Sequence, residues 1–313
     1  MNRFIKKIKF NLISTLVILL SISVNAVAKD IGLFLNNNGY KSINLKNING
    51  YLYADGLVSD RPMTAIVDTG SNGISITPNS LLRLKELKMT PYKTGQKSMN
   101  SDGKVTFDQG VTLHNLTIGN VRIKETPAKI LDLSFNNKLP TLVIGIHFLR
   151  KYHAIIDTYN NKMYLSFKGL SKENKFEFQN ILQSDKFHKI SLMAIKSGQM
   201  LIPISINNKR SVSFLFDTGT GITLISRDYA KSLKEVKKNK GEVKTISINS
   251  ITMNPLNTYF QDKVVIEDVT AQIENLSSMT KYLDVLGIVG LPQMIKGHTI
   301  IVTDEDTVYM KSS

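Results

Sequence analysis

Two stretches decide how this sequence is interpreted: Ile66-Val67-Asp68-Thr69-Gly70-Ser71 and Leu215-Phe216-Asp217-Thr218-Gly219-Thr220. They lie 149 residues apart in a chain of 313 residues. Each follows an apolar strand pattern, and each leads into a second apolar run that contains Ile74 or Ile222. A lone Asp-Thr-Gly is an ordinary turn sequence, so the information lies in the repetition. The chain contains the same local arrangement twice.

The repetition continues downstream in the same order. An apolar-apolar-Gly signal, Val143-Ile144-Gly145, recurs as Ile288-Val289-Gly290. The stretch His153-Ala154-Ile155-Ile156 recurs as His298-Thr299-Ile300-Ile301. These later matches repeat at 145 residues, so the halves differ by four residues of loop, and ordered matches at nearly the same spacing indicate an internal repeat. They predict a duplicated half-molecule.

Each half has the pattern of a β structure. Short β-branched runs are separated by clusters of Gly, Asn and Asp, and helical signals are sparse. The stretch from Ile155 to Phe167 predicts a hairpin, and Ile300 to Met310 is its copy. Short helices are expected over Leu81 to Leu87 and over Tyr229 to Leu233. The sequence therefore predicts an all-β fold with two homologous lobes and a cleft between them.

The N-terminus has the features of an export signal. Positively charged residues precede the apolar run from Phe10 to Val24, and Ala26-Val27-Ala28 supplies the small residues of a cleavage site. The run is shorter than the roughly 20 residues that a membrane-spanning helix needs. We expect residues 1–28 to be a cleaved signal peptide, with an uncleaved anchor or a buried helix as alternatives. The mature protein would be periplasmic or secreted, without stable membrane insertion.

The remaining boundaries follow from the repeat. We expect an N-terminal lobe over residues 29–167, an interlobe connection over 168–186, and a C-terminal lobe over 187–313. The connection is polar, with four apolar residues that would form one short packed helix: Phe176, Phe178, Ile181 and Leu182. Few residues separate Ala28 from the first strand at Ile43, so we expect no long pro-segment.

Composition excludes several kinds of chemistry. The chain has no Cys, so it has no disulfide, thiolate metal site or Cys nucleophile. Its five His form no His-Glu-x-x-His pair, and we expect neither a metal nor an organic cofactor. The net charge of +15 could attract nucleic acid, but no basic stripe with interleaved aromatics is present. We therefore expect no nucleic-acid partner.

The paired Asp-Thr-Gly loops resemble those of aspartic peptidases of the pepsin/retropepsin superfamily, and the resemblance covers essentially the whole mature chain. Ser71 and Thr220 resemble the pattern of two-lobed pepsins. The stretches Phe148-Leu149 and Ile155-Ile156-Asp157 are more similar to bacterial retropepsin-like proteins. The chain is thus identified as a two-lobed, bacterial-type member.

Asp68 and Asp217 would each lie at the tip of a loop that closes an apolar strand. Two carboxylates in contact cannot both ionise cheaply, so they share a proton, as is known for aspartic-protease dyads. One would activate a water molecule and the other would donate a proton to the scissile carbonyl. The sequence does not assign the base. The pair predicts a catalytic dyad.

The neighbouring residues would support the dyad. Gly70 and Gly219 lack a side chain, so their backbone N–H groups can approach the carboxylates closely. The resemblance implies that Thr69 and Thr218 form hydrogen bonds across the lobe interface. It also implies that the hydroxyl groups of Ser71 and Thr220 bind the outer carboxylate oxygens.

The resemblance further implies a flap, a hairpin that folds over the cleft. The candidate is Ser98 to Thr106, with Ser101, Asp102 and Gly103 at its tip. Pepsins usually carry a Tyr in the flap, supported by a Trp. This segment contains no Tyr, and the chain contains no Trp. The counterpart in the second half would lie in Gly241 to Asn254, as a hairpin or only a loop.

These observations predict an aspartic endopeptidase, a hydrolase whose substrate is a polypeptide in extended conformation. Since one chain carries both loops, we expect the protein to be active as a monomer. The alternative is a catalytically silent peptide-binding protein on the same fold.

Overall fold

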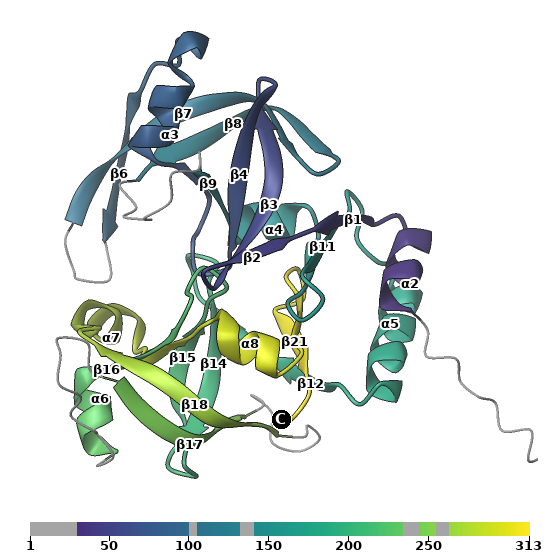
Figure 1. Cartoon of the computed structure of the whole chain (residues 1–313), viewed down its shortest axis with the longest axis vertical. Coiled ribbons are helices and arrows are strands. Elements are labelled where there is room, and N and C mark those ends of the chain that lie inside the picture. Colours follow the sequence, from purple (N-terminus) through teal and green to yellow (C-terminus); the bar gives the residue numbers. More distant parts are fainter. Residues whose placement is uncertain (1–29, 100–104, 132–140, 234–244, 255–262) are drawn as a thin grey trace, which may run out of the picture.

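The computed structural model describes residues 30–99, 105–131, 141–233, 245–254 and 263–313. The signal peptide expected over residues 1–28 lies outside them. Two β lobes lie one above the other, and a pair of helices flanks them at one side (Figure 1). The all-β, two-lobed fold predicted from the repeat is confirmed.

The first lobe is a closed barrel of six strands, because β3 pairs with β7 as well as with β4. In order around the barrel the strands are β3 (Tyr51–Val58), β4 (Arg61–Asp68), β9 (Thr141–Gly145), β5 (Ile74–Ile76), β8 (Val121–Ile130) and β7 (Val105–Ile118). Two further strands, β2 (Lys46–Ile48) and β6 (Tyr92–Met99), pair with β3 and β7.

The second lobe repeats this barrel, closed by pairing of β14 with β17. Its strands, in the same order, are β14 (Met200–Ile206), β15 (Val212–Phe216), β19 (Gly287–Val289), β16 (Thr223–Ser226), β18 (Val264–Glu274) and β17 (Thr245–Met253). A short strand, β13 (Met193–Ala194), pairs with β14 as β2 pairs with β3.

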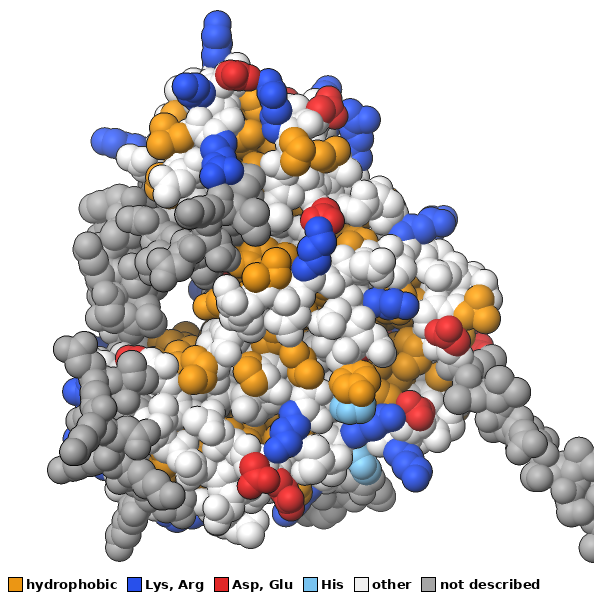
Figure 2. All heavy atoms as spheres, viewed as in Figure 1, with side chains coloured by type: hydrophobic (Ala, Val, Ile, Leu, Met, Phe, Trp, Pro, Cys, Tyr) orange, Lys and Arg blue, Asp and Glu red, His pale blue; other side chains and the backbone are white. Residues whose placement is uncertain are grey.

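The surface carries its charge in a dispersed form. On the face in Figure 2, Lys and Arg side chains are scattered over both lobes instead of forming one stripe. Within the described part of the chain, no helix is long and apolar enough to cross a membrane.

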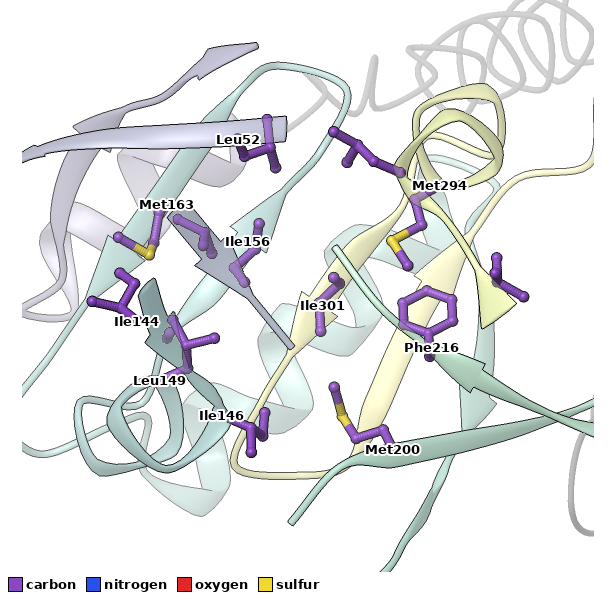
Figure 3. Packing of buried hydrophobic residues seen from close by; sticks show 14 of the residues in the cluster. Leu52, Ile144, Ile146, Leu149, Ile156, Met163, Met200, Phe216, Met294 and Ile301 are labelled. Atoms are coloured by element: carbon purple, nitrogen blue, oxygen red, sulfur yellow. The ribbon is translucent and has the colours of Figure 1, made fainter. Parts of the chain in front are cut away.

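A third sheet joins the lobes. Its six strands are β1 (Lys41–Asn44), β11 (Lys162–Leu165), β10 (Ile155–Asp157), β20 (Ile300–Val302), β21 (Thr307–Met310) and β12 (His188–Ser191). The two hairpins expected from the sequence are β10–β11 and β20–β21. The central strands pair antiparallel, with Ile156 opposite Ile301. In Figure 3 these two residues lie between core residues of the two lobes, such as Met163 and Met200. The two lobes thus share one hydrophobic core.

Helices α2 (Ile31–Asn37) and α5 (Lys172–Ser184) pack against each other beside this sheet (Figure 1). Helix α2 precedes β1, and α5 precedes β12 at the same distance along the chain. The linking residues Gly39 and Lys186 both have positive φ, and Tyr40 and Phe187 after them are both buried. Helix α5, in the expected connection, therefore occupies the position in the second half that α2 occupies in the first.

The packed helix expected in the connection is α5, which Ser171 caps by accepting a hydrogen bond from the N–H of Asn174. Phe178, Ile181 and Leu182 are buried as expected. The expectation for Phe176 is wrong, because its position on the helix turns it outward and leaves it 68% exposed.

The other helices are short. The Thr77 side chain caps α3 by accepting a hydrogen bond from the N–H of Ser80, so this helix begins earlier than expected. A 3-10 turn follows it. Helix α6 begins after its cap, Ser226, as expected. Their bounds are α3 (Pro78–Arg83), the 3-10 turn (Lys85–Leu87), α4 (Ile146–Lys151), α6 (Arg227–Ser232), α7 (Ser277–Leu283) and α8 (Leu291–Lys296).

Helix α2 offers a test of the flanking helix pair. The ring of Phe34 is 7% exposed and stacks on Phe178 of α5 with ring centroids 5.9 Å apart. Phe34→Ala should lower the free energy of unfolding by about 3 kcal/mol, because it leaves a cavity between the helices. Leu33→Ala, at a neighbouring position that is 60% exposed, should change it by less than about 0.5 kcal/mol. Urea denaturation measures both, and equal effects would contradict the packing role of α2.

Candidate active site

Each Asp of the repeated motif stands at the end of a central barrel strand. Asp68 ends β4, which runs parallel to β9 and places Asp68 opposite Gly145. In the second lobe β15 ends one residue before Asp217, whose N–H donates to the carbonyl of Val289 at 3.1 Å. Because the lobes repeat one another around the shared sheet, the two strand ends meet at the lobe boundary.

The apolar-apolar-Gly signal explains how the loops are held. The N–H of Ile146, just after Gly145, donates to the carbonyl of Ser71 at 2.8 Å, and Leu291 does the same to Thr220 at 2.9 Å. A Cβ at Gly145 would lie 2.5 Å from the Ser71 carbonyl oxygen. Such a contact is too close, so only glycine lets the backbone pass beneath the loop.

Thr69 and Thr218 connect the loops to each other. The Thr69 hydroxyl donates to the carbonyl of Phe216 at 2.9 Å and accepts from the N–H of Thr218 at 3.0 Å. The Thr218 hydroxyl donates to the carbonyl of Val67 at 2.7 Å and accepts from the N–H of Thr69 at 3.1 Å. Both side chains are fully buried. These four crossed hydrogen bonds join the two lobes directly beneath the carboxylates.

The glycines bring each loop against the opposite carboxylate. The N–H of Gly70 donates to Oδ1 of Asp217 at 3.1 Å. A Cβ at Gly70 would lie 2.4 Å from Cγ of Asp217, and one at Gly219 would lie 2.3 Å from Cγ of Asp68. No side chain fits at either position, so the two carboxyl groups approach one another across the lobe boundary.

The hydrogen bonds to the two carboxyl groups differ. Asp217 accepts from the N–H of Gly219 and the hydroxyl of Thr220, both at 2.7 Å, in addition to the N–H of Gly70. Asp68 accepts from the backbone N–H of Ser71 at 2.8 Å. The expected hydroxyl bond is thus present at Thr220, whereas Ser71 binds Asp68 through its backbone. The contacts of Asp217 thus include three donors, one of which comes from the opposite loop.

The proton of the pair belongs on Asp68. Burial raises the pKa of Asp68 well above its ordinary value, and the charge of Asp217 and a hydrogen bond between the two side chains raise it further. The backbone N–H groups of Ser71 and Gly70 act in the opposite direction on this pKa. The raised pKa keeps the proton on Asp68, a choice that the sequence left open.

The expected flap lies only partly within the described residues. β6 and β7 pair as an antiparallel hairpin up to Met99 opposite Val105. Its expected tip, Ser101, Asp102 and Gly103, lies outside the described residues. In the second lobe residues 245–253 form strand β17 instead of a loop, and 241–244 lie outside the description.

Two residues beside the loops escaped the sequence analysis. The side-chain N–H of Gln199 donates to the carbonyl of Gly70 at 2.9 Å. The phenol of Tyr51 lies close enough to the dyad that, after burial, the charges of Asp217 and Asp68 raise its pKa. Tyr51 precedes Asp68 by 17 residues and Gln199 precedes Asp217 by 18, so the repeat alignment pairs these two positions only with a one-residue gap.

The site has the composition of an acid–base centre. Among the residues that the structure describes, no group of three His, Asp or Glu side chains is arranged to hold a metal ion. The described groups here are two carboxyls, backbone N–H groups and hydroxyls.

Two closed β barrels with an Asp-Thr-Gly loop from each at their boundary define a two-lobed, pepsin-like fold. Residues 54–151 match the family model described as gag-polyprotein putative aspartyl protease, so the first lobe contains a retropepsin-like aspartyl protease domain. The matched range includes Asp68 and ends before the second loop. No curated protein matches the chain.

The crossed threonine bonds make a prediction for stability. Thr218→Val keeps the shape of the side chain but leaves the N–H of Thr69 and the carbonyl of Val67 without their buried partner. The free energy of unfolding should fall by about 2–4 kcal/mol, because each unsatisfied buried group costs about 1–3 kcal/mol. Thr270→Val, at an exposed position of β18, is the matched control and should have little effect. Equal urea midpoints for the two variants would contradict the assignment.

A second prediction concerns pH. Asp68 is protonated in the folded protein above the pH at which an ordinary Asp ionises, about 3.8. As pH rises from that value to the raised pKa, the unfolded chain releases a proton that the folded chain retains, so wild-type stability falls. Asp68→Asn removes this loss. The variant should gain stability over wild type as pH rises above about 3.8. A difference that does not depend on pH would contradict the raised pKa.

Proposed function

We propose that the protein is an aspartic endopeptidase that hydrolyses peptide bonds with a water molecule activated between Asp68 and Asp217. One observation carries the proposal: the two carboxyl groups face one another across the lobe boundary, each against the other loop's glycine. Membership of the first lobe in an aspartyl protease family supports it.

In the first step Asp217 acts as general base and Asp68 as general acid. The water oxygen attacks the scissile carbonyl carbon while its proton passes to Asp217, and Asp68 gives its proton to the carbonyl oxygen. The product is a neutral tetrahedral diol. This assignment rests on the raised pKa of Asp68, which keeps the proton on that carboxyl and leaves Asp217 to accept one from water.

In the second step the C–N bond breaks. The proton held by Asp217 passes to the leaving nitrogen, and one diol hydroxyl returns its proton to Asp68 as the carboxylic acid forms. The proton of the dyad is then on Asp68 again, and the pair can bind another water. The crossed hydrogen bonds of Thr69 and Thr218 support both steps, because the two carboxyl groups must stay close together to share a proton.

The substrate proposed is an extended polypeptide. On the face in Figure 2 the surface is hollowed between the two lobes. A β-lined boundary suits main-chain hydrogen bonding to an extended chain. Both loops come from one chain, so we propose a monomeric enzyme. The N-terminal sequence supports an exported enzyme that is periplasmic or secreted.

Cleavage of an unfolded protein by residues 29–313 tests the proposal. Asp68→Asn and Asp217→Asn should each lower kcat by about 10²- to 10⁴-fold, the usual contribution of acid–base catalysis. Activity should fall toward alkaline pH as Asp68 loses the proton that its raised pKa retains.

Asp228→Asn is the matched control, because this side chain on α6 is 95% exposed. It should cleave like wild type. Cleavage that survives both dyad substitutions would refute the site assignment. A folded wild-type protein that binds peptides without cleaving them at any pH would favour the peptide-binding alternative.

A further inference from the structure

The hairpins that precede the dyad strands carry different residues at the position beside the dyad. Tyr53 of β3 pairs with Ile66, and Leu201 of β14 pairs with Leu215. Ile66 and Leu215 each lie two residues before a dyad aspartate, so Tyr53 and Leu201 occupy the same position in the two lobes. Two residues earlier, the first lobe has Tyr51 and the second has Gln199. They are diverged copies of one repeat position.

A glycine in the left-handed region precedes this position in both lobes. Gly50 and Gly198, just before Tyr51 and Gln199, have positive φ values of 80° and 92°. Both side chains that follow are half-buried. The first hairpin turns over two residues, Asn49 and Gly50, and the second over three, residues 196–198. Both nevertheless place the following residue against the opposite lobe, where the side chains differ.

Each of the two hairpins reaches the loop of the opposite lobe. Gln199 donates to the carbonyl of Gly70, and its amide oxygen accepts from the Ser197 hydroxyl, so its amide is held at both ends. On the other side a Cβ at Gly50 would lie 2.9 Å from Cα of Gly221, and a Cβ at Gly221 would lie 3.5 Å from Cε2 of Tyr51. The Tyr51 ring thus lies against the second loop, near both carboxyl groups.

This difference matters because the cleft is nearly two-fold symmetric and a peptide is not. A symmetric cleft would bind an extended peptide equally well in either direction. Direction must come from groups that differ between the halves. Gln199 and Tyr51 form such a pair beside the reacting groups. Gln199 offers an amide that is anchored to the backbone of Gly70, and Tyr51 offers an aromatic ring with a hydroxyl.

We propose that Tyr51 is a specificity-determining residue of this cleft, which contacts the peptide on the first-lobe side of the dyad and, with Gln199, sets the direction in which the peptide lies. The ring offers an apolar face to a substrate side chain, and the hydroxyl can donate to a substrate carbonyl. The inference rests on the proposed peptidase function. It assigns Tyr51 no part in proton transfer.

Two substitutions of Tyr51 separate its contributions. Tyr51→Phe keeps the ring and removes the hydroxyl. It should raise KM about three- to tenfold, the value of one hydrogen bond, with kcat within twofold of wild type. Tyr51→Gln makes the two repeat positions alike. Mass spectrometry of digests of an unfolded protein should then show that residue preferences on the two sides of the cleaved bond become more similar.

The same substitutions at Tyr159 are the control. Tyr159 lies in the β10–β11 turn, is 51% exposed and stacks on His298, so its loss should leave KM and the cleavage pattern unchanged. The inference is overturned if both Tyr51 variants keep the KM and cleavage pattern of wild type. Because Tyr51→Phe retains the packed ring, we expect it to fold, and urea denaturation checks this.

Failure of the proposed function would give a different result. If wild type does not cleave, binding of pepstatin by calorimetry replaces KM. Binding that Tyr51→Phe weakens three- to tenfold would support Tyr51 as a peptide contact even though hydrolysis had failed. Equal binding by wild type and variant, or no binding by wild type, would overturn the inference.

Discussion

The four crossed hydrogen bonds between Thr69 and Thr218 are the constraint on which the rest of the structure depends. Each hydroxyl is both donor and acceptor, and each bond runs from one lobe to the other. Two carboxyl groups repel one another when both are charged, and burial makes that repulsion stronger. A loose pair of lobes would relieve it by separating. The threonine bonds, together with the central β10–β20 pairing, prevent this, so the pair must bind a proton instead.

The two lobes are alike in their buried parts and differ in the contacts around the dyad. The buried parts repeat closely: both barrels have the same strand order, and Ile156 meets its own copy, Ile301, at the centre of the shared sheet. Differences appear around the dyad. Thr220 binds Asp217 through its hydroxyl, whereas Ser71 binds Asp68 through its backbone. A structure with equal halves could not distinguish acid from base, so the differences between the lobes are where chemical roles are assigned.

Much of this could be predicted from the sequence, because duplication makes weak signals strong. The Asp-Thr-Gly loops, the glycines beneath them and the hairpins of the shared sheet each occur twice, and the structure has them at both places. Helix α2 was missed, since its seven residues carry little periodic pattern and its counterpart α5 had been interpreted as a connection. Phe176 was misplaced because an apolar residue in a short helix does not reveal which face is covered. Such orientation depends on tertiary packing.

The assignment of acid and base, and the position of Tyr51, could not come from sequence for a related reason. Both aspartates are followed by Thr and Gly, and the raised pKa of Asp68 comes first from its burial and then from the nearby Asp217, which depend on the folded structure. Tyr51 is seventeen residues from Asp68 in the chain and approaches it only because the β3 hairpin returns to the lobe boundary. Sequence repetition identifies which residues are equivalent. Only the folded arrangement shows that Tyr51 and Gln199, which are equivalent by position, contact opposite loops with side chains of different chemistry. A two-fold cleft needs such a difference to bind a peptide in one direction.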